Sequence, residues 1–137
     1  MKKTLSLLLS LVLMLSLALP ASAAETEYPT LEGGVTEIQK YGNIGLDIDP
    51  ADLKDGGYKY GDLLTVTVNG TGYDMPLCTN YSDVDTGALV LRDSEGVLIA
   101  AINMGDFATS NGLAAKVTAE DGSYTWEFPE GQSLESI

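Results

Sequence analysis

The chain has 137 residues and a formal net charge of −13, with seven basic residues, twenty acidic residues and no histidine. This charge argues against binding to DNA, RNA or anionic membranes, because those partners require Lys and Arg to displace counterions from phosphates. Without histidine, Ser-His-Asp and Cys-His mechanisms are excluded, and the commonest metal ligand is missing.

The first residues have the pattern of a bacterial-type export signal. Lys2 and Lys3 form a charged start, an apolar run extends from Leu5 to Leu19, and Ala21-Ser22-Ala23 offers a small-residue cleavage site. A bilayer span needs about 20 apolar residues, so a retained membrane anchor is the less favoured alternative. We therefore expect residues 1–23 to be a signal peptide cleaved near Ala23, and the mature protein to be secreted or extracytoplasmic.

The rest of the chain predicts one β domain. Residues 24–34 mix acidic residues with Pro and Gly, as linkers do. Over residues 35–128, short apolar or alternating runs recur between Gly, Asn and Asp clusters, which predicts many short strands in a sandwich or barrel. These strands are predicted at residues 35–40, 44–48, 63–69, 72–78, 88–92, 97–102, 113–119 and 123–128. One short helix is predicted over residues 105–110, and residues 129–137 lose the pattern and are predicted to be a flexible tail.

Several polar side chains invite a functional interpretation but fit a structural one better. Residues 47–57 hold four aspartates, yet Ala51 occupies the fifth position of a calcium loop and no glutamate closes it, so a solvated loop is favoured and no metal site is predicted. Asp83 and Asp85 flank a turn and fit turn formation better than acid-base hydrolysis. The single cysteine, Cys78, cannot form an internal disulfide and is interpreted as a small buried hydrophobe.

Three sequence elements and a short helix carry a resemblance to a known family. The elements are Lys40-Tyr41-Gly42-Asn43-Ile44, then Thr79-Asn80-Tyr81-Ser82-Asp83-Val84 with Gly87, then Ser94-Glu95-Gly96 and the following residues to Gly105. The helix has Ala108 and a closing Gly112-Leu113. In this order, over about residues 35–119, they resemble the C-terminal domain of the S-adenosylmethionine hydroxide adenosyltransferases, whose family includes the fluorinase and chlorinase enzymes.

The resemblance implies an all-β fold, a small antiparallel β-barrel with one short helix, that holds the adenosyl part of a ligand. It implies that Tyr41 forms part of the adenine wall and that Asn43 contacts the polar edge of the base, as an Asn amide does when it reads adenine. It also implies that Ser94 lies near the amino-acid end of the ligand. Backbone groups of Ile102, Asn103 and Met104 match the positions that edge the base.

In the family a separate N-terminal domain provides the reaction centre, and here 34 residues precede Val35. Gln39 and Glu95 also differ from the acidic residue and the arginine that the family has near these places. We therefore expect no catalysis by this chain alone, and assign no catalytic residue and no cofactor. The expected ligand is adenosine or S-adenosylmethionine. Adenosine is favoured over ATP because the acidic protein repels the added phosphates and the sequence has no phosphate-binding loop to hold them.

Three functions stay open from the sequence. The first is an exported, non-catalytic adenosyl-binding module. The second is an extracellular interaction or structural module that reuses the barrel and binds an exported protein partner instead of a ligand. The third is a subunit that completes, in trans, the site of an adenosyltransferase or S-adenosylmethionine hydrolase encoded separately. The oligomeric state does not follow from the sequence.

Overall fold

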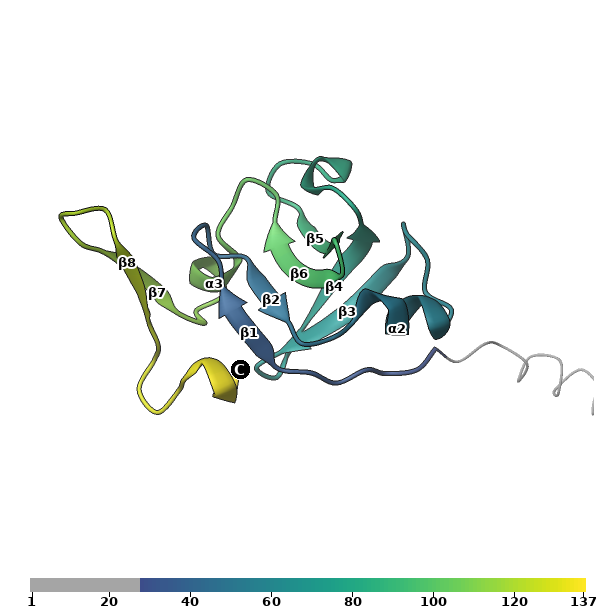
Figure 1. The fold of residues 1–137 in the computed structure, drawn as a ribbon, viewed down its shortest axis with the longest axis horizontal. Coiled ribbons are helices and arrows are strands. Elements are labelled where there is room, and N and C mark those ends of the chain that lie inside the picture. Colours follow the sequence, from purple (N-terminus) through teal and green to yellow (C-terminus); the bar gives the residue numbers. More distant parts are fainter. Residues whose placement is uncertain (1–27) are drawn as a thin grey trace, which may run out of the picture.

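The computed structural model describes residues 28–137, so the predicted export signal lies outside the described residues. Six strands form one curled sheet in the order β1-β2-β6-β5-β4-β3 (Figure 1). They are β1 (Val35–Ile38), β2 (Ile44–Leu46), β3 (Leu63–Val68), β4 (Thr71–Cys78), β5 (Leu89–Ser94) and β6 (Val97–Ile102). A separate antiparallel hairpin contains β7 (Ala115–Thr118) and β8 (Tyr124–Glu127). Each of the eight predicted strands overlaps an observed one.

The helices are short. Two are α-helical, α2 (Pro50–Asp55) and α3 (Phe107–Ser110), and two are single 3-10 turns, η1 (Tyr81–Asp83) and η2 (Leu134–Ser136). The helix predicted over residues 105–110 is α3, whereas α2 was not predicted. Asp49 begins α2 by accepting a hydrogen bond from the Ala51 amide at 2.9 Å, and Leu53 anchors it in the core. The acidic stretch 47–57 is therefore largely a capped helix, and no group of three candidate metal ligands gathers within residues 28–137.

The mostly β fold is confirmed, but the predicted small antiparallel β-barrel with one short helix is wrong in detail. Strands β4 and β5 pair in parallel, with Leu77 opposite Leu91 and Cys78 opposite Arg92. Within the described part of the chain, β1 and β3 do not pair, so the sheet curls into a half-barrel that stays open. A parallel pair needs a crossover connection, and residues 79–88 provide it by passing through η1.

The main core lies inside the curl of the sheet. Its fully buried side chains include Ile44, Met75, Leu77, Leu98 and Phe107. Alternation along β3 places Leu64 and Val68 in this core, and Thr65 and Thr67 toward solvent. The aromatic ring of Phe107 in α3 meets Tyr73 edge-on, with centroids 5.1 Å apart.

A second, smaller core covers the opposite face of the same strands. It contains Cys78, Val90, Ile99 and Ala101. Burial, followed by the nearby Asp83 carboxylate, raises the pKa of the Cys78 thiol. The interpretation of Cys78 as a small buried hydrophobe is confirmed, because its side chain is buried among these apolar neighbours.

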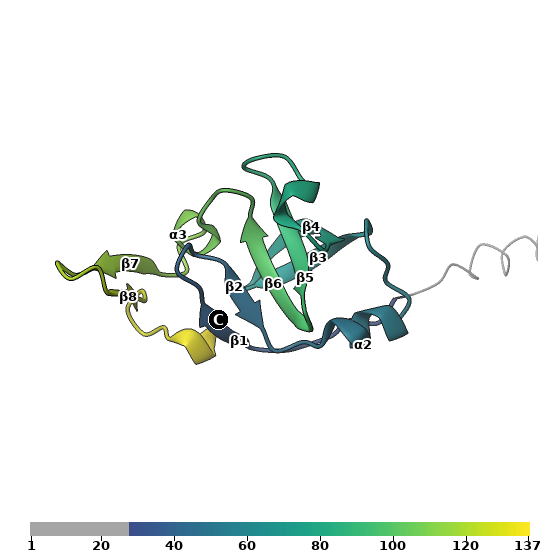
Figure 2. The same ribbon diagram turned by 45° about the horizontal axis from the view of Figure 1, so that its top comes forward.

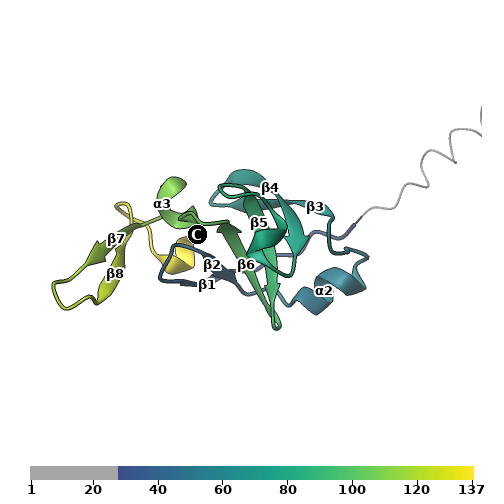
Figure 3. The same ribbon diagram turned by 90° about the horizontal axis from the view of Figure 1, so that it is seen from above.

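The β7–β8 hairpin projects away from the sheet in three views of the molecule (Figure 1, Figure 2 and Figure 3). Its base is attached to the body through Trp126, which packs against the main core. Leu134 and Ile137, in the segment predicted to be a flexible tail, pack against the same core. None of the helices formed by residues 28–137 is long and apolar enough to cross a membrane.

The unpaired edges of β1 and β3 leave a hollow of about 770 Å³, which we call the apolar hollow. Its walls include Val35, Leu53, Leu64, Leu91 and Leu98. Residues 28–34 run across it as a strap, where the Tyr28 ring stacks on Tyr58 with centroids 5.0 Å apart. The apolar hollow is thus continuous with the main core and is partly covered by the two ends of the described chain.

Candidate functional site

A second hollow, of about 530 Å³, lies where the β1–β2 turn meets η1 and the turn after β6. We call it the tyrosine groove, after Tyr41 and Tyr81 in its wall. Five of the six residues predicted to contact the ligand line it, namely Tyr41, Asn43, Ile102, Asn103 and Met104. Its other lining residues, which the sequence did not single out as ligand contacts, are Lys40, Tyr81, Gly105, Asp106 and Lys116.

Ser94, the sixth predicted residue, lies elsewhere. It ends β5 and pairs with Val97 at the beginning of β6, whereas the tyrosine groove adjoins Ile102 at the end of that strand. Five residues of extended chain separate these positions, about 16 Å along the strand. Ser94 is therefore absent from the groove wall.

The β1–β2 turn presents Tyr41 to solvent. The Gln39 amide donates to the Asn43 carbonyl at 2.8 Å, and the Gly42 amide donates to the Gln39 carbonyl at 2.9 Å, which closes a three-residue loop. Gly42 has a φ of +90°, and a side chain there would collide with the Asp106 carboxylate. The tight loop leaves Tyr41 at its tip with 70% of its surface exposed, at the mouth of the groove.

Asn43 lies deeper and is held by a second aromatic residue. Its Nδ2 donates to the Tyr81 hydroxyl at 3.3 Å, which leaves the Oδ1 acceptor and one amide hydrogen without a partner among residues 28–137. Tyr81 is in turn covered by the Arg92 guanidinium, 4.5 Å from the ring centroid. Arg92 Nε donates to the Thr79 carbonyl at 3.0 Å, so the Asn43 amide is oriented by a connected set of contacts.

The turn after β6 supplies main-chain groups. The Gly105 amide donates to the Ile102 carbonyl at 3.0 Å, and Met104 adopts a φ of +61°, which is uncommon for a residue with a side chain. Asn103 holds the turn: its amide donates to the Ala88 carbonyl, its carbonyl accepts from the Gly87 amide, and its Nδ2 donates to the Val84 carbonyl at 2.9 Å.

The main-chain N–H and carbonyl of Met104, unlike those of Asn103, have no backbone hydrogen-bond partner among the described residues. The Asn103 carbonyl accepts a hydrogen bond from the Gly87 amide. The Met104 N–H belongs to the same trans peptide and points in the opposite direction, away from Gly87. Met104 therefore offers both a donor and an acceptor at the groove edge, in a strained conformation that the surrounding turn enforces.

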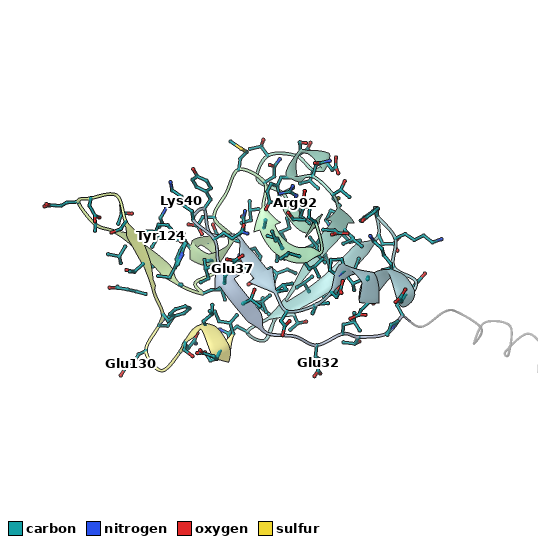
Figure 4. All side chains as sticks on the ribbon, viewed as in Figure 1. Glu32, Glu37, Lys40, Arg92, Tyr124 and Glu130 are labelled. Carbon is teal, nitrogen blue, oxygen red and sulfur yellow. The ribbon has the colours of Figure 1, made fainter. Side chains whose placement is uncertain are left out.

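Two lysines give the groove a positive rim. The ammonium groups of Lys40 and Lys116 lie 5.6 Å and 5.9 Å from the Tyr41 ring centroid. Lys116 reaches there from β7 and donates to the Lys40 carbonyl at 2.9 Å, while its ammonium also covers Tyr124. Figure 4 shows Lys40 and Tyr124 on the same side of the molecule, between the β1–β2 turn and the hairpin.

Comparison with known proteins identifies this architecture. Residues 33–119 match the SAM hydroxide adenosyltransferase C-terminal domain. The chain belongs to this family. Every residue that lines the tyrosine groove lies inside the matched range, whereas β8 lies beyond it.

A solved structure is also similar to this chain. It is the crystal structure of an uncharacterized conserved protein from Thermotoga maritima, to part of which this chain is similar. The TM-score is 0.55 at 26% sequence identity, over 63% of this chain and 35% of the other. This chain therefore spans about a third of the length of that protein. No curated protein matches it significantly.

Proposed function

We propose that this chain is an exported adenosyl-binding module of the SAM hydroxide adenosyltransferase C-terminal type that does not catalyse a reaction by itself. The observation that carries the proposal is that Tyr41, Asn43 and the Met104 main chain line one groove although they come from distant parts of the sequence. The matched residues correspond to the C-terminal domain of the family, which supports binding rather than catalysis.

The groove has the chemistry that adenine recognition needs. An exposed tyrosine ring offers a stacking surface for a flat base, and stacking tolerates the open side of the groove. The free Oδ1 and N–H of Asn43 match the amino group and the neighbouring ring nitrogen of adenine. A volume of about 530 Å³ is in the ordinary range for small-molecule sites, which is consistent with a ligand of nucleoside size.

Calorimetric titration of the purified protein with adenosine and with S-adenosylmethionine tests the proposal. We expect binding that weakens at least about tenfold in Asn43→Ala, because the polar edge of the base loses its partner. Gln132→Ala is the matched control, since it removes an exposed side-chain amide that does not line the groove. Absence of heat at millimolar ligand, with a folded protein by circular dichroism, would contradict the proposal.

Incubation with S-adenosylmethionine tests the second half of the proposal, that the chain does not catalyse alone. We expect the ligand to be recovered unchanged by chromatography after hours with stoichiometric protein. Release of adenosine and methionine above the rate without protein would show that this chain has catalytic activity of its own.

A role as an interaction module is the second candidate, because the β7–β8 hairpin projects from the body with Val117 and Tyr124 exposed. Its expected signature is specific capture of one exported protein, unaffected by Asn43→Ala and lost with Val117→Asp. Capture that depends on Asn43, or that survives the change at Val117, would count against it.

A further inference from the structure

The basic residues of this acidic protein are unevenly distributed. Residues 28–137 contain five of them, in a chain of net charge −13. Lys40 and Lys116 line the tyrosine groove, and Arg92 covers the Tyr81 ring in its wall. Three of the five cations are thus concentrated at one hollow, although negative charge dominates the chain as a whole.

These lysines keep hydrogen-bonding capacity for a ligand. Lys116 uses one of its three ammonium hydrogens, for the Lys40 carbonyl. The Lys40 ammonium makes no hydrogen bond within residues 28–137 and lies only near the Tyr41 ring.

Asp106, the one carboxylate in the groove wall, already accepts hydrogen bonds from within the protein. It caps α3 by accepting from the Thr109 amide at 2.9 Å and from the Thr109 hydroxyl at 2.8 Å. The groove therefore offers more positive than negative charge to a ligand.

We propose that the ligand of the tyrosine groove is a phosphorylated adenine nucleoside of the monophosphate class, in preference to neutral adenosine or to the cationic S-adenosylmethionine. This inference rests on the proposed adenosyl-binding function and adds the charge of the ligand. The Lys40 and Lys116 ammonium groups lie near the Tyr41 ring. A base that stacks on this ring displaces an ammonium group from it, and that ammonium group then pairs with the phosphate of the ligand. The local charge outweighs the net charge of the protein, because distant charges are screened.

Calorimetry with adenosine 5′-monophosphate, adenosine and S-adenosylmethionine tests the inference. We expect the monophosphate to bind about tenfold more tightly than adenosine at low salt, and this advantage to shrink to about twofold near 0.5 M salt. Lys116→Gln and Lys40→Gln should each reduce the ratio of monophosphate affinity to adenosine affinity, with both ligands measured on the same variant. Lys59→Gln is the matched control, because it makes the same charge change at an exposed lysine outside the groove.

The outcomes separate the two proposals. Equal affinity for the monophosphate and adenosine overturns the inference about charge and leaves the adenosyl-binding function standing. A loss of the advantage in Lys59→Gln as large as in Lys116→Gln also overturns it, because net charge would then explain the preference. Absence of binding by all three ligands to folded protein overturns the adenosyl-binding function itself.

Discussion

The apolar hollow and the tyrosine groove differ in how many polar groups without a hydrogen-bond partner their walls present. The apolar hollow is the larger, about 770 Å³ against 530 Å³, but several of its wall residues, among them Leu53, Leu64 and Leu98, also belong to the main core and lie beside polar residues such as Glu32 and Thr65. The tyrosine groove has an exposed ring, a half-used amide, free main-chain groups and two ammonium groups. The comparison teaches why the proposed function assigns the ligand to the smaller hollow: recognition depends on polar groups that have no partner among the described residues, and volume alone does not report them.

The largest expected effect concerns the apolar hollow. Leu98 is 2% exposed and lines it, so Leu98→Ala should lower the free energy of unfolding by about 2–5 kcal/mol, measured by urea denaturation. Adenosine affinity of the remaining folded protein should not change. A cost below about 1 kcal/mol would show that this wall is not part of the core.

Gly42→Ala should affect both stability and binding. The positive φ and the adjacent Asp106 carboxylate leave no room for a methyl group, so we expect a loss of about 1–3 kcal/mol of unfolding free energy. Because the same loop carries Tyr41 and Asn43, ligand affinity should fall with it. Gly70→Ala is the comparison, since it also has a positive φ but open space around it. An equal loss of unfolding free energy at both positions would show that the clash with the Asp106 carboxylate does not contribute.

Tyr41→Ala should separate binding from stability. With 70% of its surface exposed, Tyr41 contributes little to packing, so the unfolding free energy should stay within about 0.5 kcal/mol. Binding of the base should weaken by about 1–3 kcal/mol, measured by calorimetry. Tyr28→Ala, an exposed tyrosine at the apolar hollow, should leave binding unchanged. The reverse pattern would assign the ligand to the apolar hollow.

The smallest expected effect is a pH dependence beside the apolar hollow, where Asp93 joins β5 to α2. Partial burial pushes the pKa of Asp93 upward, but hydrogen bonds from Tyr60, Lys54 and the Gly96 amide outweigh this and lower the pKa below its ordinary value. The stabilisation is therefore present above the ordinary pKa of about 3.9 and is lost as pH falls through the folded value.

Asp93→Asn should lower stability at pH 7 by less than about 1 kcal/mol, because the pair with Lys54 is partly exposed. The difference from the unmodified protein should vanish near pH 2, in thermal denaturation, and ligand affinity at pH 7 should not respond. A difference that persists at pH 2 would mean that the carboxylate charge is not its source.

Local signals were enough for most of the fold. Strands such as β3 alternate apolar and β-branched polar residues, and turns such as Asn69-Gly70 mark where they end, so strand positions followed from short windows of sequence. Helix α2 was missed because its start signal, Asp49-Pro50, lies in an acidic run that was compared with a calcium loop. Its cap chemistry was available in the sequence, since Asp before Pro is a common helix start.

Only part of the candidate site could be predicted from the sequence. The resemblance named Tyr41, Asn43 and residues 102–104, which the fold does bring into one groove. Tyr81 and Lys116 were not named as ligand contacts, because their positions depend on the path of residues 79–88 and on the placement of β7 beside the β1–β2 turn. Ser94 was placed by resemblance, and the β5–β6 register carries it to the other end of the hairpin.

The sequence by itself determined the strands, the short helix α3, the acidic character and the family, because these depend on neighbouring residues and on motifs in order. Only the tertiary structure decided that β4 and β5 run in parallel, that the barrel stays open between β1 and β3, and that two lysines from distant segments meet at Tyr41. The physical reason is that strand direction, edge pairing and clustering of charge are set by the packing of segments far apart in the chain, which no local pattern specifies.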